Sequence, residues 1–268
     1  MLKDITIGQY YSTDSIIHKL DPRTKIIATL ILIISLFIYT KLSVFIIAGI
    51  YIIAIIHLSK VPLAFILRGM KSIMFLIAIT LIFNIFLTPG EEILRIPYIN
   101  LKVSIEGLKN AGYTVVRLIY LIIGSSLMTL TTTPNNLTDG LEKLLMPLSK
   151  LKVPVHEIAM MMSIALRFIP ILMEEMDKIM KAQTARGADF EHGGLIKRSK
   201  ALIPILVPLF VSSFRRANDL AMAMEARCYR GGEGRTKMKP LKYKKIDYIS
   251  YFCLATYMGL IIATGVLL

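Results

Sequence analysis

Long apolar runs alternate with short polar connections over the first half of the chain, and one more run ends it. A helix that crosses a bilayer needs about 20 mostly apolar residues, and shorter runs suffice when Lys or Arg flanks them. The pattern predicts five such helices, at residues 26–40, 42–58, 70–88, 113–133 and 247–268. Only Lys41 separates the first two, which predicts a tight helical hairpin. The polar stretch 91–110 is predicted to be a loop with a short helix.

Residues 134–245 contain two further apolar runs that do not fit the pattern of a span. The run 158–173 is interrupted by Arg167 and Pro170, and the run 201–214 has only 14 residues and two prolines. Runs of this length belong to buried or interfacial helices more often than to membrane spans. We therefore predict two amphipathic helices that lie at the membrane surface and stack on each other.

The distribution of charge gives these segments an orientation. The chain has 32 Lys and Arg against 18 Asp and Glu, a formal net charge of +14. Twenty of the basic residues lie in 134–245, between apolar runs, as in the cytoplasmic loops of multi-pass proteins. This segment and the N-terminus are therefore predicted to face the cytoplasm, and nucleic acid is not expected as a partner. The chain is predicted to be an all-α integral membrane protein with about five transmembrane helices. Its domains would be a membrane domain at 1–133, a cytoplasmic or interfacial domain of long coupling helices at 134–245, and a final helix at 246–268.

The phrase Ala-x-x-Ala-Arg occurs twice in the basic segment, ending at Arg186 and at Arg227. The first phrase ends a predicted helix whose apolar residues recur every three or four positions. An arginine in the last turn of a helix can simply complement the helix dipole, by about 0.3–1 kcal/mol. Repetition with small residues at fixed offsets favours a second reading, in which each tip enters a groove and its guanidinium meets a carboxylate. The candidate docking residues are Ala185, Arg186, Gly187, Ala226, Arg227 and Cys228.

Methionine is concentrated on the same predicted helix, between positions 160 and 180. Flexible thioether side chains fill gaps in a core, and they also form adaptable surfaces that hold more than one partner. Both readings stay open. The candidate partner contacts are Met160, Met161, Met162, Phe168, Met173 and Met176.

Motifs that would indicate catalysis are absent from the sequence. No Gly-Lys dipeptide occurs, so the chain has no Walker A loop and cannot be the ATPase of a pump. His156-Glu157 begins like a zinc-protease motif, but Met160 occupies the position of the second histidine. We therefore expect no enzymatic activity, no metal and no cofactor. Arg117, inside the fourth predicted span, is either a snorkelling anchor or a transport-site charge.

Four spans, two long helices ending in Ala-Arg-Gly and Ala-Arg-Cys, and one last span resemble the transmembrane T component of energy-coupling factor (ECF) transporters. The resemblance covers the whole chain. It extends to Thr-Ile-Gly-Gln-Tyr-Tyr at 6–11 and Leu-Asp-Pro-Arg-Thr-Lys at 20–25, which resemble members serving interchangeable substrate-binding subunits. The family favours glycine where this chain has Cys228, so we expect the second tip to end slightly later, at Gly231.

The resemblance implies a transmission role in a bacterial cell membrane. Two ABC-type ATPases would each receive one arginine tip in an acidic groove. The long helices would pass their motion to a membrane-embedded substrate-binding (S) subunit, for uptake of a vitamin or another micronutrient. Two alternatives stay open: a conventional ABC importer permease with one coupling helix, and a membrane enzyme of lipid metabolism.

Overall fold

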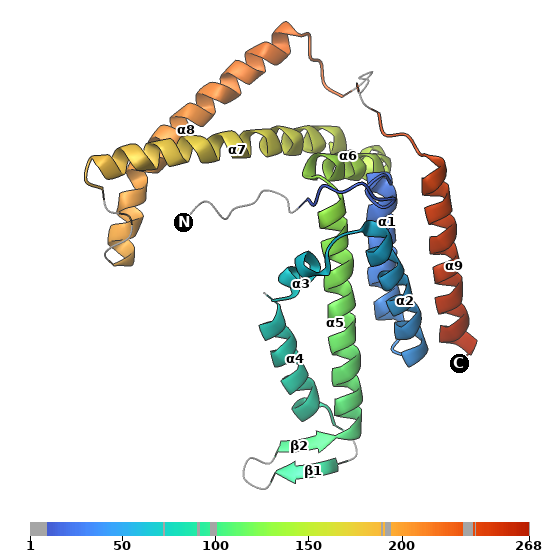
Figure 1. Ribbon diagram of the computed structural model, residues 1–268. Coiled ribbons are helices and arrows are strands. Elements are labelled where there is room, and N and C mark those ends of the chain that lie inside the picture. The colour runs from blue at the N-terminus through green and yellow to red at the C-terminus, as the bar shows by residue number, and fades with distance from the viewer. Residues whose placement is uncertain are drawn as a thin grey trace. The chain divides into compact units, whose positions relative to one another are not determined.

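The computed structural model describes residues 10–71, 73–89, 92–96, 101–188, 190, 194–232, 238 and 240–267. Positions 6–9 of the first family-like phrase lie outside these residues. The elements in chain order are α1 (Pro22–Ile38), α2 (Leu42–Ser59), α3 (Leu63–Lys71), α4 (Met74–Leu87), β1 (Glu92–Ile96), β2 (Leu101–Ser104), α5 (Ile105–Thr131), α6 (Pro134–Leu145), the 3₁₀-helix η1 (Met146–Leu151), α7 (Val155–Ala185), α8 (Leu195–Ala226) and α9 (Lys245–Leu267) (Figure 1). The fold is that of an all-α integral membrane protein with one small β-hairpin.

Four helices of the described chain are long and apolar enough to cross a membrane, namely α2, α5, α7 and residues Lys245–Gly265 of α9. The first predicted span corresponds to α1, which has 17 residues. The third prediction has the wrong bounds, because α3 ends at Lys71 and α4, with only 14 residues, begins at Met74. Helix α7 qualifies by length and composition, although its apolar run 158–173 is predicted to lie at the membrane surface. That surface placement stays a prediction.

The stretch 91–110 is not the predicted loop with a short helix. Strands β1 and β2 pair antiparallel, with Leu94 opposite Val103 and Ile96 opposite Leu101. Helix α5 then begins well before the predicted span. Ser104 caps it, because its hydroxyl oxygen accepts a hydrogen bond from Gly107 N (2.9 Å) and its hydroxyl donates to the carbonyl of Thr88 (2.9 Å). The alternation of apolar and polar residues in β2 and the serine cap were the signals in the sequence.

Contacts divide the described chain into two compact units. One comprises described residues of Glu142–Pro240, and the other comprises described residues of Gly8–Leu141 with Leu241–Leu268. We call the first the long-helix unit and the second the membrane unit.

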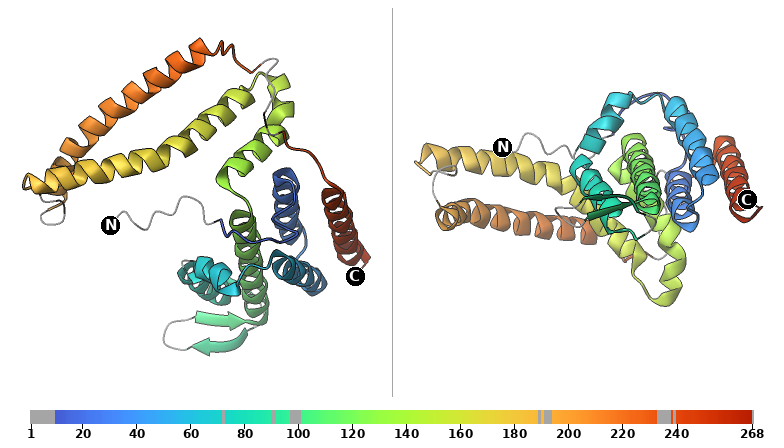
Figure 2. Two further views of the ribbon diagram at one scale, coloured as in Figure 1. Left: turned by 45° about the horizontal axis from the view of Figure 1, so that its top comes forward. Right: turned by 90° about the horizontal axis from the view of Figure 1, so that it is seen from below.

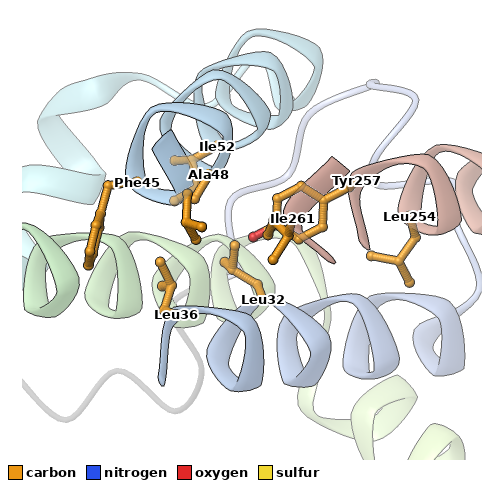
Figure 3. Packing of buried hydrophobic residues seen from close by; sticks show 9 residues of the cluster. Leu32, Leu36, Phe45, Ala48, Ile52, Leu254, Tyr257 and Ile261 are labelled. Atoms are coloured by element: carbon orange, nitrogen blue, oxygen red, sulfur yellow. The ribbon is translucent and has the colours of Figure 1, made fainter. Parts of the chain in front are cut away.

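Side chains of α1, α2 and α9 form the core of the membrane unit (Figure 3). The hydroxyl groups of Ser35 and Tyr257 lie 2.7 Å apart inside it, which satisfies both where no water is available. Gly124 lets α5 approach α1 closely, since a Cβ atom there would lie 2.6 Å from Leu32 Cδ2. The helices of the predicted hairpin are confirmed as α1 and α2. The buried members of this core are Leu32, Leu36, Val44, Phe45, Ala48, Ile52, Leu254, Tyr257 and Ile261.

The sequence Asp-Pro-Arg at the start of α1 is a helix start in the structure. Asp21 is the N-cap residue and accepts a hydrogen bond from Arg23 N at 2.9 Å, while Pro22 opens the helix. The Arg23 guanidinium forms an ion pair with Asp21 (2.9 Å) and lies 3.9 Å from the ring centroid of Tyr243. Burial would raise the pKa of the Asp21 carboxyl, but hydrogen bonds from Arg23 outweigh burial and hold that pKa below its usual value.

A single buried carboxylate joins the starts of α1 and α9. Asp247 is 1% exposed, and its oxygens accept hydrogen bonds from the backbone N–H groups of Asp21 and Lys244, both at 2.7 Å. The Thr24 hydroxyl donates a third, longer bond of 3.4 Å. Asp21 and Lys244 directly precede the two helices, so Asp247 satisfies one N–H group at the start of each.

Two long helices, α7 and α8, form most of the long-helix unit (Figure 2). Helix α7 has 31 residues and contains Pro170, and α8 has 32 residues and contains Pro204 and Pro208. The predicted helix from 155 to the first arginine is confirmed and is about 46 Å long at about 1.5 Å per residue.

The predicted stacking of the two apolar runs is only half right. Residues between 164 and 172 of α7 face the segment 213–224 of α8 across a groove of about 280 Å³. Small side chains at Ala217 and Ala221 of α8 line this groove and allow close packing. Within the run 201–214 of α8, Ile205 is only 4% exposed, whereas Ile203, Val207 and Phe210 are each more than half exposed.

Candidate docking site

The first Ala-x-x-Ala-Arg phrase ends in a Schellman motif. Helix α7 ends at Ala185, and Arg186 is its C-cap residue with φ −87° and ψ 7°. Gly187 N donates to Thr184 O and Ala188 N donates to Gln183 O, both at 3.0 Å. Gly187 has φ +87°, the left-handed conformation that the motif requires and that glycine adopts without strain.

The second phrase ends in the same way. Helix α8 ends at Ala226, and the C-cap residue Arg227 has φ −92° and ψ 14°. Cys228 N donates to Glu225 O at 2.8 Å, and Tyr229 N donates to Met224 O at 3.0 Å. The two arginines therefore occupy the same position of the same backbone motif.

The expectation that the second tip ends later, at Gly231, is wrong. Cys228 itself takes the left-handed conformation with φ 56°, and Gly231 (φ +95°) lies beyond the motif. A side chain in this conformation costs about 1 kcal/mol or more. The two backbone hydrogen bonds, which satisfy carbonyl groups of the last turn, offset that cost.

Both tips present their small and charged residues to the outside. Ala182, Ala185 and Arg186 are exposed, as are Ala226 and Arg227. Within the described residues neither guanidinium makes an ion pair or a side-chain hydrogen bond. The carbonyl groups of the last turn are capped by backbone N–H groups instead, so the arginine side chains are not needed for capping.

The helix pair holds the two tips at opposite ends. Helix α8 begins close to the end of α7 and runs back, so Arg186 and Arg227 are carried at far ends of the pair (Figures 1 and 2). An ion pair joins Glu175 of α7 to Arg216 of α8 at 2.9 Å. Hydrogen bonds from Ser212 and Arg216 hold the pKa of the Glu175 carboxyl below its usual value.

The chain after the second tip returns to the start of α7. His156 of α7 lies 3.0 Å from a carboxylate oxygen of Glu142 on α6. A Cβ atom at Gly232 would lie 2.4 Å from the His156 ring, so glycine is required for this close passage. His156 is thus enclosed by Glu142 and Gly232 at the start of α7.

The predicted partner contacts differ in how exposed they are. Met161 (58% exposed) and Met162 (42% exposed) lie on the surface of α7, whereas Phe168 lines the groove between α7 and α8. Met160, Met173 and Met176 are half-buried. Met161 and Met162 therefore do not fill a core within this chain, whereas Phe168 packs between α7 and α8.

Sequence reasoning missed an exposed apolar stripe on α8. Its residues recur at helical spacing and each is more than half exposed: Ile203, Val207, Phe210 and Phe214. The spacing was visible in the sequence, but the expected stacking on α7 would have buried the stripe. A contiguous exposed apolar surface of this kind marks an interaction site.

Known proteins are similar to this chain in sequence over most of its length. The family model described as cobalt transport protein (CbiQ) matches residues 13–238. The energy-coupling factor transporter transmembrane protein EcfT of Clostridium kluyveri is 57% identical over 94% of this chain and 94% of that protein. The proteins of the same name from Heliobacterium modesticaldum and Bacillus subtilis are 54% and 48% identical, each over 92% of this chain and over 92% and 93% of those proteins. Matches of this extent, together with the two arginine tips, show that the chain belongs to the family of transmembrane subunits of energy-coupling factor transporters.

Proposed function

We propose that this chain couples two cytosolic ABC-type ATPases to a membrane-embedded S subunit that takes up a vitamin or another micronutrient. Arg186 docks into an acidic groove of one ATPase and Arg227 into that of the other. ATP-driven movement of the ATPases shifts the tips, and α7 and α8 carry the shift to the S subunit. The chain itself performs no catalysis and needs no cofactor.

The observation that carries this proposal is the equivalence of the two tips. Both arginines are exposed C-cap residues of Schellman motifs, with φ and ψ values that differ by less than 10°. Two equal tips suit two partners of one kind, because the same groove can accept the same backbone shape and the same guanidinium. The alternative, an importer permease with a single coupling helix, would explain only one of the two arginine tips.

Cys228 provides a direct test of docking at the second tip. It is exposed, follows Arg227 directly and is one of two cysteines in the chain. In a Cys253→Ser chain, we expect maleimide to label Cys228 readily in the isolated subunit and only slowly once the ATPases are bound, because docking buries the tip. The measurement is the labelling rate by mass spectrometry, with and without the ATPases.

The matched control places a thiol elsewhere in the long-helix unit. Ser149 is exposed in η1, and Ser149→Cys, made in a Cys228→Ser/Cys253→Ser chain, should react equally fast in both states. Equal labelling of Cys228 with and without the ATPases contradicts docking at this tip.

The apolar surfaces of α7 and α8 are the proposed contacts of the S subunit. Exposed Met161 and Met162 on α7 and the α8 stripe offer soft apolar packing without a fixed partner shape. Their positions differ from the arginine tips, so attachment of the S subunit and of the ATPases should be separable.

Exchanging Met160, Met161 and Met162 for Asn is expected to release the S subunit and to leave the ATPases attached. Val207→Asn/Phe210→Asn on α8 should act in the same way, since truncation of a central apolar contact typically costs about 2 kcal/mol or more. Copurification of both partners from membranes measures the effect. Leu148→Asn, at an exposed leucine of η1, is the control that should release neither. Loss of the ATPases together with the S subunit would mean that these residues maintain the helix pair instead.

A further inference from the structure

Arg117 of α5 is a cation without a partner inside the membrane unit. Its Nε and Nη2 atoms are buried, and no described residue accepts a hydrogen bond from them. Two aromatic rings stand close, with the centroids of Phe37 of α1 and Phe45 of α2 at 5.3 and 5.9 Å from the guanidinium carbon. An unsatisfied charged group in an apolar setting is costly, which makes it a marker of function in membrane helices.

No carboxylate on the surrounding helices can neutralise Arg117. The segments of α1, α2 and α4 contain no Asp or Glu, and the only acidic residue of α5 is Glu106, about 16 Å away along the helix at about 1.5 Å per residue. The acidic residue of α9, Asp247, lies in its first turn and is committed to the starts of α1 and α9. Since the described residues offer no carboxylate to Arg117, we look for its counter-charge in a ligand.

The depth of Arg117 indicates where that charge lies. Phe37 is the penultimate residue of α1, and Phe45 belongs to the first turn of α2. The guanidinium is therefore level with the end of the α1–α2 hairpin. A helix of 17 residues is about 25 Å long, slightly less than the hydrocarbon core of a bilayer of about 30 Å, so its end lies near the lipid head groups.

An apolar groove adjoins this position. It has a volume of about 360 Å³, lies between α2 and α5, and is lined by Phe45, Ile46, Gly112 and Tyr113 among others. The rings of Phe45 and Tyr113 stack with centroids 5.4 Å apart, so Phe45 borders both the groove and Arg117. Lys109 adds a second cation to the lining. The site thus combines positive charge at head-group depth with a surface suited to a hydrocarbon chain.

We infer that Arg117 and the neighbouring groove bind a membrane phospholipid. The phosphate accepts hydrogen bonds from the guanidinium, with Lys109 as a second cation, and one acyl chain lies in the groove between α2 and α5. The bound lipid supplies the counter-charge that the described residues do not provide and fills the groove between α2 and α5. This inference does not depend on the ATPase or S subunit partners.

The test is native mass spectrometry of the full-length chain in mild detergent, titrated with dioleoyl phosphatidylglycerol. Arg117→Gln should weaken binding about tenfold or more, because it removes charged hydrogen bonds, and Arg117→Lys should retain part of the affinity. Gly112→Leu should also weaken binding by filling the groove. A Cβ atom at Gly112 meets nothing within 4 Å, so this variant is expected to fold.

The chain offers a matched control for each variant. Arg215→Gln removes an exposed arginine of the long-helix unit, and Gly259→Leu fills equally open space on α9, so both should bind the lipid like the unaltered chain. The inference is overturned if Arg117→Gln binds phosphatidylglycerol as well as the unaltered chain, or if inorganic phosphate displaces the lipid. It is also overturned if no lipid binds and only attachment of the S subunit depends on Arg117, which would identify a partner carboxylate as the counter-charge.

Discussion

Exchanging Arg186 and Arg227 together for Glu is expected to abolish substrate uptake and substrate-stimulated ATP hydrolysis in the assembled transporter. Each guanidinium is exposed and unpaired within the described chain, so it is available to a partner. Losing one side of a buried charge pair typically costs about 2–5 kcal/mol, because the other charge is left without a partner. Glutamate adds repulsion from an acidic groove, so two such changes should leave no productive complex.

The single variants reveal whether the tips are equivalent. Arg186→Glu and Arg227→Glu should each reduce copurification of the ATPases to a similar degree, since both residues have the same backbone position. Arg186→Lys should be intermediate, because an ammonium group lacks the planar fork of a guanidinium. Arg215→Glu, at an exposed arginine of α8 away from the tip, should have little effect. Normal uptake by the double variant would refute docking through these arginines.

Exchanging Asp247 for Ala is expected to destabilise the membrane unit by about 3 kcal/mol or more. The carboxylate accepts hydrogen bonds from two backbone N–H groups and one hydroxyl, and it is 1% exposed. Without it, these donors stay buried, and each unsatisfied donor costs about 1–3 kcal/mol. The starts of α1 and α9 would lose their shared cap. The midpoint of thermal unfolding in detergent measures the loss.

Two comparisons separate this role from a general effect of charge. Asp247→Asn keeps one carbonyl oxygen as an acceptor and should fall between Ala and the unaltered chain. Asp219→Asn, at an exposed carboxylate of α8, should leave the unfolding midpoint unchanged. ATPases should still copurify with Asp247→Ala, because both arginine tips belong to the long-helix unit. An unchanged unfolding midpoint for Asp247→Ala would show that water or a neighbouring oxygen replaces the carboxylate.

Local signals explain where prediction from the sequence succeeded and where it failed. The prolines inside α7 and α8 did not end these helices, and the length of α7 was predicted correctly from its apolar periodicity up to Arg186. The span predicted at 70–88 includes Lys71, where α3 ends, and α4 begins only at Met74. The second tip was predicted to end at Gly231 because glycine is preferred in the left-handed conformation. The backbone hydrogen bonds of the last turn instead place Cys228 in that conformation.

The sequence by itself determined the membrane class, the two arginine phrases and the long helices that carry them. These features depend on composition and on short-range periodicity, which neighbouring residues along one helix are enough to set. Only the tertiary structure decided that Asp247 caps two helices distant in sequence and that the α8 stripe stays exposed. It also decided that Arg117 meets no carboxylate among the described residues. Each of these three features depends on which helices pack against each other. That choice is made by the packing of whole surfaces rather than by neighbouring residues along one helix.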